Sequence, residues 1–347
     1  MQGAGPTDGP VHPWEPELPP FHTKTTARAL LWAGLALIAL LAFTSLFVGV
    51  STLSPAALWH EGMSGRSAQV LFTSRLPRTL ALMLAGAGMA MAGLVMQTLV
   101  RNRFVEPSTV GTTEAAGLGI LLVMLLAPDL PVLARMLVAA GFGLAGTALF
   151  LAVLRTVPLR STLMVPLIGI LLSGVIGAVS TFIAYRHDFL QSLTAWMQGD
   201  FSIILRGRYE MLWLALVMLV ALYVAADRFT VAGLGKEVAT GLGLNHRGIL
   251  WLGLSLVALI SAAVVATVGN IPFLGLVVPN IVSLMVGDNT RRALPLVVIG
   301  GAGMVLACDI VGRLVIRPYE LPIGTTMGVI GSAVFLYLLL RGRGRVA

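Results

Sequence analysis

The sequence predicts an all-α polytopic membrane protein with about ten transmembrane helices. Of its 347 residues, 57% are hydrophobic and only 11% are charged, whereas soluble domains carry about 25% charged residues. A surface so poor in charge does not keep a chain of this length in solution, which argues against soluble enzymes, secreted scaffolds and disordered proteins. The apolar residues are gathered into runs close to the roughly 20 residues that cross a bilayer.

Ten such runs follow one another along the chain. The first, 29–50, contains no charged residue. The uncharged stretch 249–286 is too long for one span and long enough for two, and we divide it at 269–272, where Pro272 follows a Gly-Asn pair and interrupts the helical hydrogen bonds. The predicted spans are 29–50, 79–100, 110–127, 131–154, 162–185, 211–226, 249–268, 273–286, 293–312 and 321–340.

The two ends of the chain differ from the span-forming region. Residues 1–28 are polar and proline-rich, without a basic start or a small-residue cleavage site, so they predict a disordered cytoplasmic tail rather than a signal peptide. Residues 29–341 form the expected membrane domain. Residues 342–347 are expected to be a short basic cytoplasmic tail.

The distribution of Lys and Arg predicts the orientation in the cell membrane. With the N-terminus inside, the inner segments hold 14 of the 23 basic residues and the outer segments hold 9. The excess favours both termini in the cytoplasm. The net charge of +8 does not indicate nucleic acid here, because the arginines lie between apolar runs, where lipid headgroups and topology account for them. Nine outward arginines are nevertheless more than topology requires.

The sequence lacks the residue patterns that would indicate catalysis, ATP binding or metal binding. The histidines lie in the tail or in loops, no G-x-x-x-x-G-K-[ST] phosphate loop is present, and Cys308 is the single cysteine. Only Glu114 and Asp309 bring carboxylates near the apolar interior. We therefore expect no catalytic residue, metal site or cofactor on this chain. An ion-coupled secondary transporter remains an alternative, with Glu114 and the break at 269–272 as its candidate features.

Two outer segments concentrate charge. Arg75 and Arg78 are three residues apart with Pro77 between them, which predicts a helix start that projects a pair of cations; anchoring to lipid headgroups is the alternative. Asp309 and Arg313 are four apart and are expected to form a structural ion pair. Arg313 and Arg317 would then add to the outward-facing basic set.

Two inner segments are also distinctive. In the glycine-bounded stretch 233–244, Leu234, Val238 and Leu242 recur at helical spacing and predict a two-turn amphipathic helix, either a docking element or an interfacial linker. Lys236, Glu237 and Thr240 occupy its other side. In the turn 101–111, Pro107 disfavours helix at the residue before it, and Ser108 or Thr109 could cap the third span.

Taken in order, these segments resemble the permease subunits of the iron-siderophore, haem and cobalamin ABC importers. The resemblance covers roughly 30–340 and depends on five motifs in register with ten spans. They are RLPRTLA at 75–81, GAGMAMAGLVMQTLVRNRF at 86–104, GLGKEVATGLGL at 233–244, GNIPFLGLVVPN at 269–280, and DIVGR at 309–313 with ELPIG at 320–324.

The resemblance implies the fold of a type II ABC importer permease and a division of labour among subunits. An extracytoplasmic siderophore-binding protein would dock through acidic residues onto Arg75, Arg78, Arg313 and Arg317. A separate ABC subunit would hold ATP and Mg²⁺ and receive the helix of Leu234, Lys236, Glu237, Val238 and Leu242 in a groove. The cytoplasmic gate would lie near Ser161 and Thr162, and the segment before 196–199 would form a short helix lining the outer cavity.

Two departures from the usual family pattern narrow the range of cargoes that the resemblance implies. The chain reads RNRFVEPSTVGT at 101–112 and PNIVSL at 279–284, variants similar to the subgroup that transports ferric siderophores of the anguibactin, enterobactin and petrobactin kind. The resemblance therefore favours a siderophore over haem or cobalamin, which remain alternatives. A second permease subunit, identical or different, would complete the pathway.

Overall fold

The computed structural model of the chain describes residues 24–49, 59–60, 65–157, 164–205, 209–287, 290–316 and 318–343. Within these ranges every regular element is a helix. Of the two predicted tails, only 24–28 and 342–343 lie within the described residues, and both belong to helices.

An apolar helix is present at each of the ten predicted spans. These helices are α1 (Lys24–Phe47), α4 (Leu76–Val100), α5 (Thr112–Leu126), α6 (Val132–Thr156), α7 (Met164–Arg186), α9 (Leu212–Val224), α12 (His246–Val268), α13 (Leu274–Val286), α14 (Thr290–Val315) and α15 (Ile323–Arg343). Shorter elements between them are α3 (Arg66–Val70), the π-helical η1 (Leu71–Arg75), α8 (Leu190–Met197), α10 (Ala226–Gly233) and α11 (Lys236–Gly241).

The spans are unequal in length. In the described part of the chain, seven helices are long and apolar enough to cross a membrane, and the pair α9–α10, bent by 60°, makes an eighth. The remaining two of the ten, α5 and α13, are shorter apolar helices. The chain is therefore a multi-pass membrane protein in which two of the ten expected spans are short helices.

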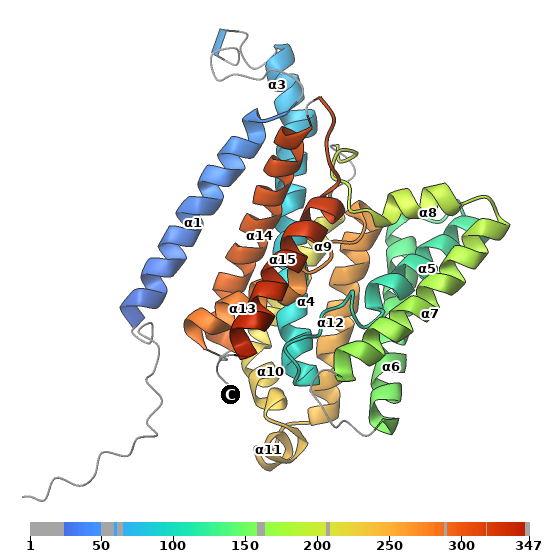
Figure 1. Ribbon diagram of the computed structural model, residues 1–347, viewed down its shortest axis with the longest axis vertical. Coiled ribbons are helices and arrows are strands. Elements are labelled where there is room, and N and C mark those ends of the chain that lie inside the picture. The colour runs from blue at the N-terminus through green and yellow to red at the C-terminus, as the bar shows by residue number, and fades with distance from the viewer. Residues whose placement is uncertain are drawn as a thin grey trace, which may run out of the picture.

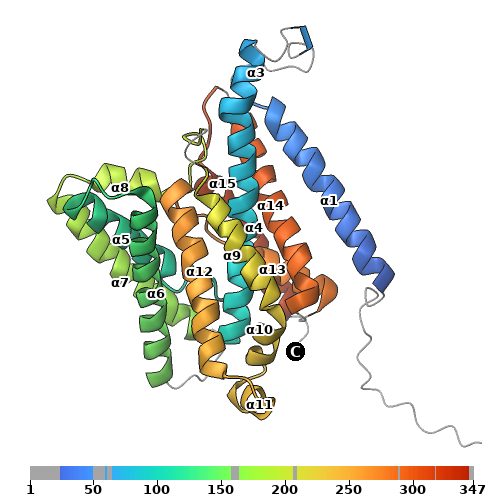
Figure 2. The same ribbon diagram turned by 180° about the vertical axis from the view of Figure 1, so that it is seen from behind.

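Helix α4 forms the centre of the bundle, between α14, α12 and α13 (Figures 1 and 2). Two crossings depend on glycine. A Cβ at Gly86 would lie 2.6 Å from the carbonyl oxygen of Gly301 in α14, and one at Gly93 would lie 2.0 Å from that of Gly275 in α13. Because lipid offers little hydrophobic drive for helix association, such backbone-to-backbone packing stabilises the bundle through close contact.

Helices α5, α6 and α7 form a second group beside α12, with α8 lying across one end of it (Figure 2). Much of α7 is exposed in the isolated chain, including Leu171, Val175 and Phe182. This apolar surface faces either lipid or another subunit.

The start of α4 differs from the sequence prediction. Helical structure begins at Arg66 and continues through η1 into α4, so Pro77 does not open the helix. Proline lacks an N–H and its ring clashes with the preceding turn of an α-helix. The wider π-helical turn that ends at Arg75 accommodates this proline without ending the helix.

The break at 269–272 is confirmed. Helix α12 ends at Val268, Gly269 has a φ of 88°, and Phe273 has a φ of 63° just before α13 begins. The cap predicted for the third span is wrong, because α5 is preceded by Gly111 in the left-handed conformation rather than by Ser108 or Thr109.

Candidate functional site

The two ends of the bundle carry the two groups of residues that the sequence singled out. Figure 1 shows α3 and the start of α4 at one end of the molecule and α11 at the opposite end. We call the first group the arginine cluster and define it as Arg75, Arg78, Asp309, Arg313 and Glu320. The second group is the segment 233–244 around α11.

Ion pairs connect the arginine cluster across three segments. Arg78 of α4 donates to Asp309 Oδ1 in α14 at 2.7 Å and to Glu320 Oε2, just before α15, at 2.5 Å. Arg313 pairs with the other oxygen of Asp309, one turn away on α14. The predicted pair of Asp309 and Arg313 is therefore present, and Arg78 joins it.

The same guanidinium groups hold the end of α1. Arg75 and Arg313 each donate to the carbonyl oxygen of Val48 at 2.6 Å, and Arg313 also reaches the hydroxyl of Ser45 at 2.6 Å. The carbonyl of Val48 follows the last turn of α1, where helical donors are absent. The two arginines satisfy this carbonyl and so join α1 to α4 and α14.

Burial corrects the expectation that Arg75, Arg78 and Arg313 project outward. Their exposed fractions are 6%, 8% and 2%. The reason is the length of the helix: Arg75 and Arg78 lie more than two turns after its start at Arg66, so they face α1 and α14 instead of water. In this conformation these three side chains do not offer a surface to a docking partner. Arg317 lies outside the described residues.

At the other end, the helix α11 is shorter than the predicted two turns. It covers Lys236–Gly241, so Leu234 precedes it and Leu242 follows it. Leu234, Val238 and Leu242 are nevertheless all exposed, as are Lys236 and Glu237, while Ala239 is buried against the rest of the chain. The segment therefore presents three apolar side chains to the surroundings. The proposed gate residues Ser161 and Thr162 lie outside the described residues.

Glu106 is a buried carboxylate that the sequence reasoning missed. It is 2% exposed, and its Oε1 accepts hydrogen bonds from the backbone N–H of Phe273 at 2.9 Å and from the hydroxyl of Ser108 at 2.6 Å. Burial raises the pKa of Glu106 to about 7. The carboxylate lies at the N-terminus of α13, where the partial positive charge of the helix end stabilises its ionised form. Its place beside Pro107 in a polar turn gave no signal of this burial.

Besides the close approach of Gly93 to Gly275, a hydrogen bond connects α4 to α13, and it depends on Pro279. Because Pro279 has no N–H, the carbonyl of Gly275 one turn earlier lacks its helical donor. Gln97 of α4 supplies a replacement, with its Nε2 at 3.0 Å from that oxygen.

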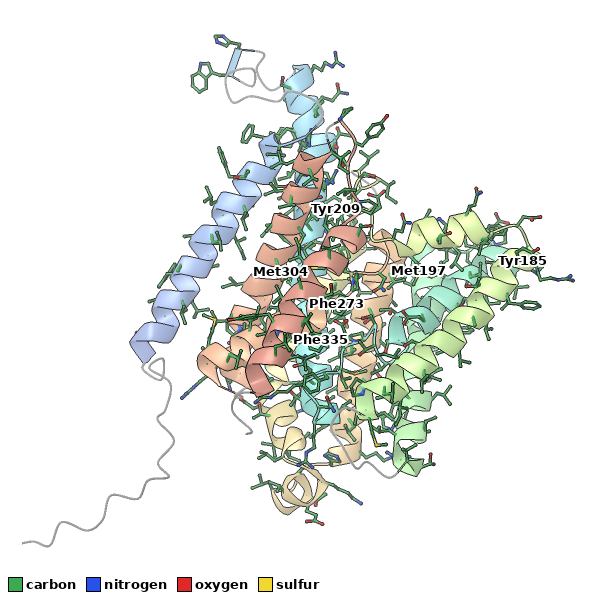
Figure 3. All side chains as sticks on the ribbon, viewed as in Figure 1. Tyr185, Met197, Tyr209, Phe273, Met304 and Phe335 are labelled. Atoms are coloured by element: carbon green, nitrogen blue, oxygen red, sulfur yellow. The ribbon has the colours of Figure 1, made fainter. Side chains whose placement is uncertain are left out.

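Figure 3 shows Phe273 and Phe335 where the start of α13 approaches α15. Gly331 of α15 makes this approach possible, since a Cβ there would lie 2.6 Å from Phe273.

Three glycines form a junction of irregular backbone. Gly199 follows α8, Gly269 follows α12, and Gly324 lies in the first turn of α15. Added Cβ atoms at these positions would lie between 2.0 and 2.4 Å from the backbone carbonyls of neighbouring segments. The segments share backbone hydrogen bonds, including one of 2.8 Å from Asp200 to Val268. This contact fixes α8, the short helix predicted beside 196–199, against the break before α13.

A cavity of about 190 Å³ lies under α8. Helices α5, α7 and α8 line it with Glu114, Ser180, Thr194 and Met197 among others. Met197 marks where α8 meets α5 (Figure 3), and its sulfur lies 3.0 Å from the position of a Cβ on Gly117. A second cavity, of about 260 Å³, lies beside the segment that contains α11.

Comparison with known proteins identifies the relatives of this fold. The FecCD transport family matches residues 37–341. The petrobactin import system permease protein YclN of Bacillus subtilis is 46% identical over 305 residues, which is 88% of this chain and 96% of that protein. The ferric-anguibactin transport system permease protein FatD of Vibrio anguillarum is 41% identical, over 86% of this chain and 95% of that protein.

A solved structure shares the architecture. An inward-facing conformation of a metal-chelate type ABC transporter superimposes with a TM-score of 0.74 and 28% sequence identity, covering 90% of this chain and 99% of the other. The fold of this chain therefore matches that of a solved transporter over almost the full length of that transporter.

Proposed function

We propose that this chain, which belongs to the FecCD transport family, carries ferric siderophore complexes across the cell membrane. It is a permease subunit of an ABC importer, a translocation subunit without catalytic activity of its own. The observation that carries the siderophore assignment is the identity of 46% and 41%, over nearly full length, to permeases named for petrobactin and anguibactin. Petrobactin and anguibactin are therefore the first cargoes to test.

The ATP-hydrolysing subunit is proposed to dock at α11. Leu234, Val238 and Leu242 are exposed there although they are apolar, and a groove on a partner would bury them. Lys236 and Glu237 flank them with charges that can pair at the rim. ATP and Mg²⁺ are assigned to that partner. A rigid-body displacement of α11 would reach the bundle through α10, which packs against α4 and α14.

The opposite end is proposed to receive the extracytoplasmic siderophore-binding protein. Here Arg75, Arg78 and Arg313 are assigned a supporting role: they fix α1, α4 and α14 relative to one another beneath the docking surface. Arg78 becomes available for direct contact if a carboxylate of the binding protein displaces Glu320, whose side chain is 20% exposed. The excess of Lys and Arg near α11 supports a cytoplasmic location for that end and for both termini.

A second permease subunit, a copy of this chain or a different one, is proposed to pack against the apolar surface of α7. The exposed side chains of Leu171, Val175 and Phe182 supply a surface for that contact. A pathway shared by two permeases would then run between them, with the cavity under α8 near its outer part and the cytoplasmic gate near Ser161 and Thr162.

Uptake of radioactive iron tests the cargo. Cells with and without the gene would receive purified chelates of petrobactin, anguibactin and enterobactin, and haem and labelled cobalamin in parallel. Loss of uptake for one siderophore class alone is the expected result. Loss of haem or cobalamin uptake instead would overturn the siderophore assignment. Siderophore uptake that requires this chain but survives inactivation of every candidate ATPase would favour an ion-coupled transporter.

A further inference from the structure

The cavity beside α11 is the feature of the described chain that the transport assignment leaves unused. It has a volume of about 260 Å³ and lies where α4, α10, α13 and α14 have their ends. Its lining combines two arginines with hydroxyl and amide side chains. They include Arg101, Asn102, Arg103, Thr230, Asn280 and Thr290.

Among the described residues that line the cavity, Arg101 and Arg103 are basic and none is acidic. The nearby carboxylate of Asp227 on α10 is paired with Arg291. Thr290 lies in the first turn of α14, where the unpaired N–H groups of a helix carry partial positive charge. Cations, hydroxyl donors and a helix start around one hollow match the chemistry of a phosphate group.

The loop that holds the two arginines has a fixed backbone. Arg101 has a φ of 57° and ends α4 in the left-handed conformation. The amide of Asn280 on α13 donates to the carbonyl oxygen of Arg103 at 2.8 Å, and Asn102 Oδ1 accepts from the N–H of Phe104 at 2.8 Å. The arginine side chains therefore start from anchored positions, which reduces the entropy lost when they bind an anion.

The cavity also borders the segment assigned to the ATPase. The guanidinium of Arg101 lies over Gly235, close enough that a Cβ there would be 3.2 Å from its Nη1. Gly235 directly precedes α11 and has a φ of 116°. A ligand on Arg101 would thus contact the joint between the membrane helices and α11.

We propose that this cavity binds a phosphate-bearing anion, presented either as the headgroup of an anionic phospholipid or as a small phosphate ester. The site lies where α4 ends and α14 begins, and the ends of membrane-spanning helices lie near the level of the lipid headgroups. The bound phosphate connects the loop after α4 to the first turn of α14. Through Arg101 it also stabilises the position of Gly235, the residue directly before α11.

The test uses the purified full-length chain in a neutral detergent. Short-chain phosphatidylglycerol is the probe, short-chain phosphatidylcholine the control lipid, and binding is measured by native mass spectrometry and by the shift of the thermal midpoint. The variant Arg101→Asn with Arg103→Gln removes both charges, and asparagine tolerates the left-handed position. Arg155→Gln is the matched control, because Arg155 is an exposed arginine at the end of another span and does not line the cavity.

The expected result is saturable binding of phosphatidylglycerol that becomes at least about ten-fold weaker in the double variant and stays unchanged in Arg155→Gln. Competition by inorganic phosphate would identify a free phosphate ester as the ligand, and its absence would identify the lipid headgroup. Equal binding of phosphatidylcholine, an equal loss in Arg155→Gln, or no loss in the double variant would overturn the proposal. If the double variant does not fold, Thr230→Glu places a carboxylate in the cavity instead, and unchanged binding in that variant would overturn it.

Discussion

Replacing Gly93 by alanine tests whether the contact between α4 and α13 holds the bundle together. A Cβ at this position would lie 2.0 Å from the carbonyl oxygen of Gly275 and 2.3 Å from its Cα. Ordinary contact begins near 3.4 Å, so the two backbones would have to separate by about 1.4 Å. Backbone, unlike a side chain, cannot rotate away.

The expected loss combines three effects. Forced separation of packed helices costs about 1–3 kcal/mol. The shift also disturbs the bond from Gln97 to the carbonyl of Gly275, worth about 1 kcal/mol. Alanine offsets about 0.5–1 kcal/mol because it favours helix over glycine. We therefore expect Gly93→Ala to lower the free energy of unfolding by about 1–3 kcal/mol.

The matched control is Gly141→Ala in α6, where an added Cβ meets nothing within 4 Å. Alanine there is expected to leave stability unchanged or to raise it by up to about 1 kcal/mol. Both variants would be unfolded by SDS in mixed micelles, with the six tryptophans as the fluorescent signal. Equal stability of the two variants would refute the assignment of the α4–α13 crossing to backbone contact.

Three further results are expected. Asp309→Asn leaves the guanidinium groups of Arg78 and Arg313 without their shared carboxylate and should cost about 3–5 kcal/mol of stability; a thermal midpoint equal to the wild type would contradict this. Val238→Asp should abolish co-purification of the ATPase, whereas Thr240→Asp on the polar side of α11 should retain it; equal retention by both would argue against the apolar contact. Because the pKa of Glu106 is raised from 4.5 to about 7, the stability it adds is complete below about pH 4.5 and is lost as pH rises through about 7, a change of about 3 kcal/mol. Glu106→Gln should remove that decline between about pH 4.5 and 7, measured as the thermal midpoint, and a decline that persists would assign it to another group.

The arginine cluster shows what residue spacing alone can predict and what it cannot. The interval of four between Asp309 and Arg313 predicted their pair correctly, because residues four apart share one face of a helix. The same reasoning placed Arg75 and Arg78 on an outward-facing helix start, which is wrong, because the helix begins at Arg66. Where a helix starts decides whether its arginines meet water or neighbouring helices. A π-helical turn that accommodates Pro77 left no mark in the sequence pattern.

Glu106 illustrates the opposite error. In the sequence it is a charged residue in a polar turn, and such residues are usually exposed. Its burial follows from the return of 101–111 against the start of α13, which is far away in sequence. Only the tertiary contact creates an environment in which that carboxylate is shielded from water and accepts the N–H of Phe273.

The sequence by itself determined the elements that depend on local patterns: the apolar helices, the break before α13, the exposed apolar residues around α11, and the family. Hydrophobic length and glycine–proline breaks are properties of neighbouring residues, so they can be read along the chain. The tertiary structure decided which charges are buried, which glycines touch backbone, and which arginines line a cavity. These depend on contacts between residues such as Gly93 and Gly275, or Arg78 and Glu320, that are remote in sequence and adjacent only after the helices pack.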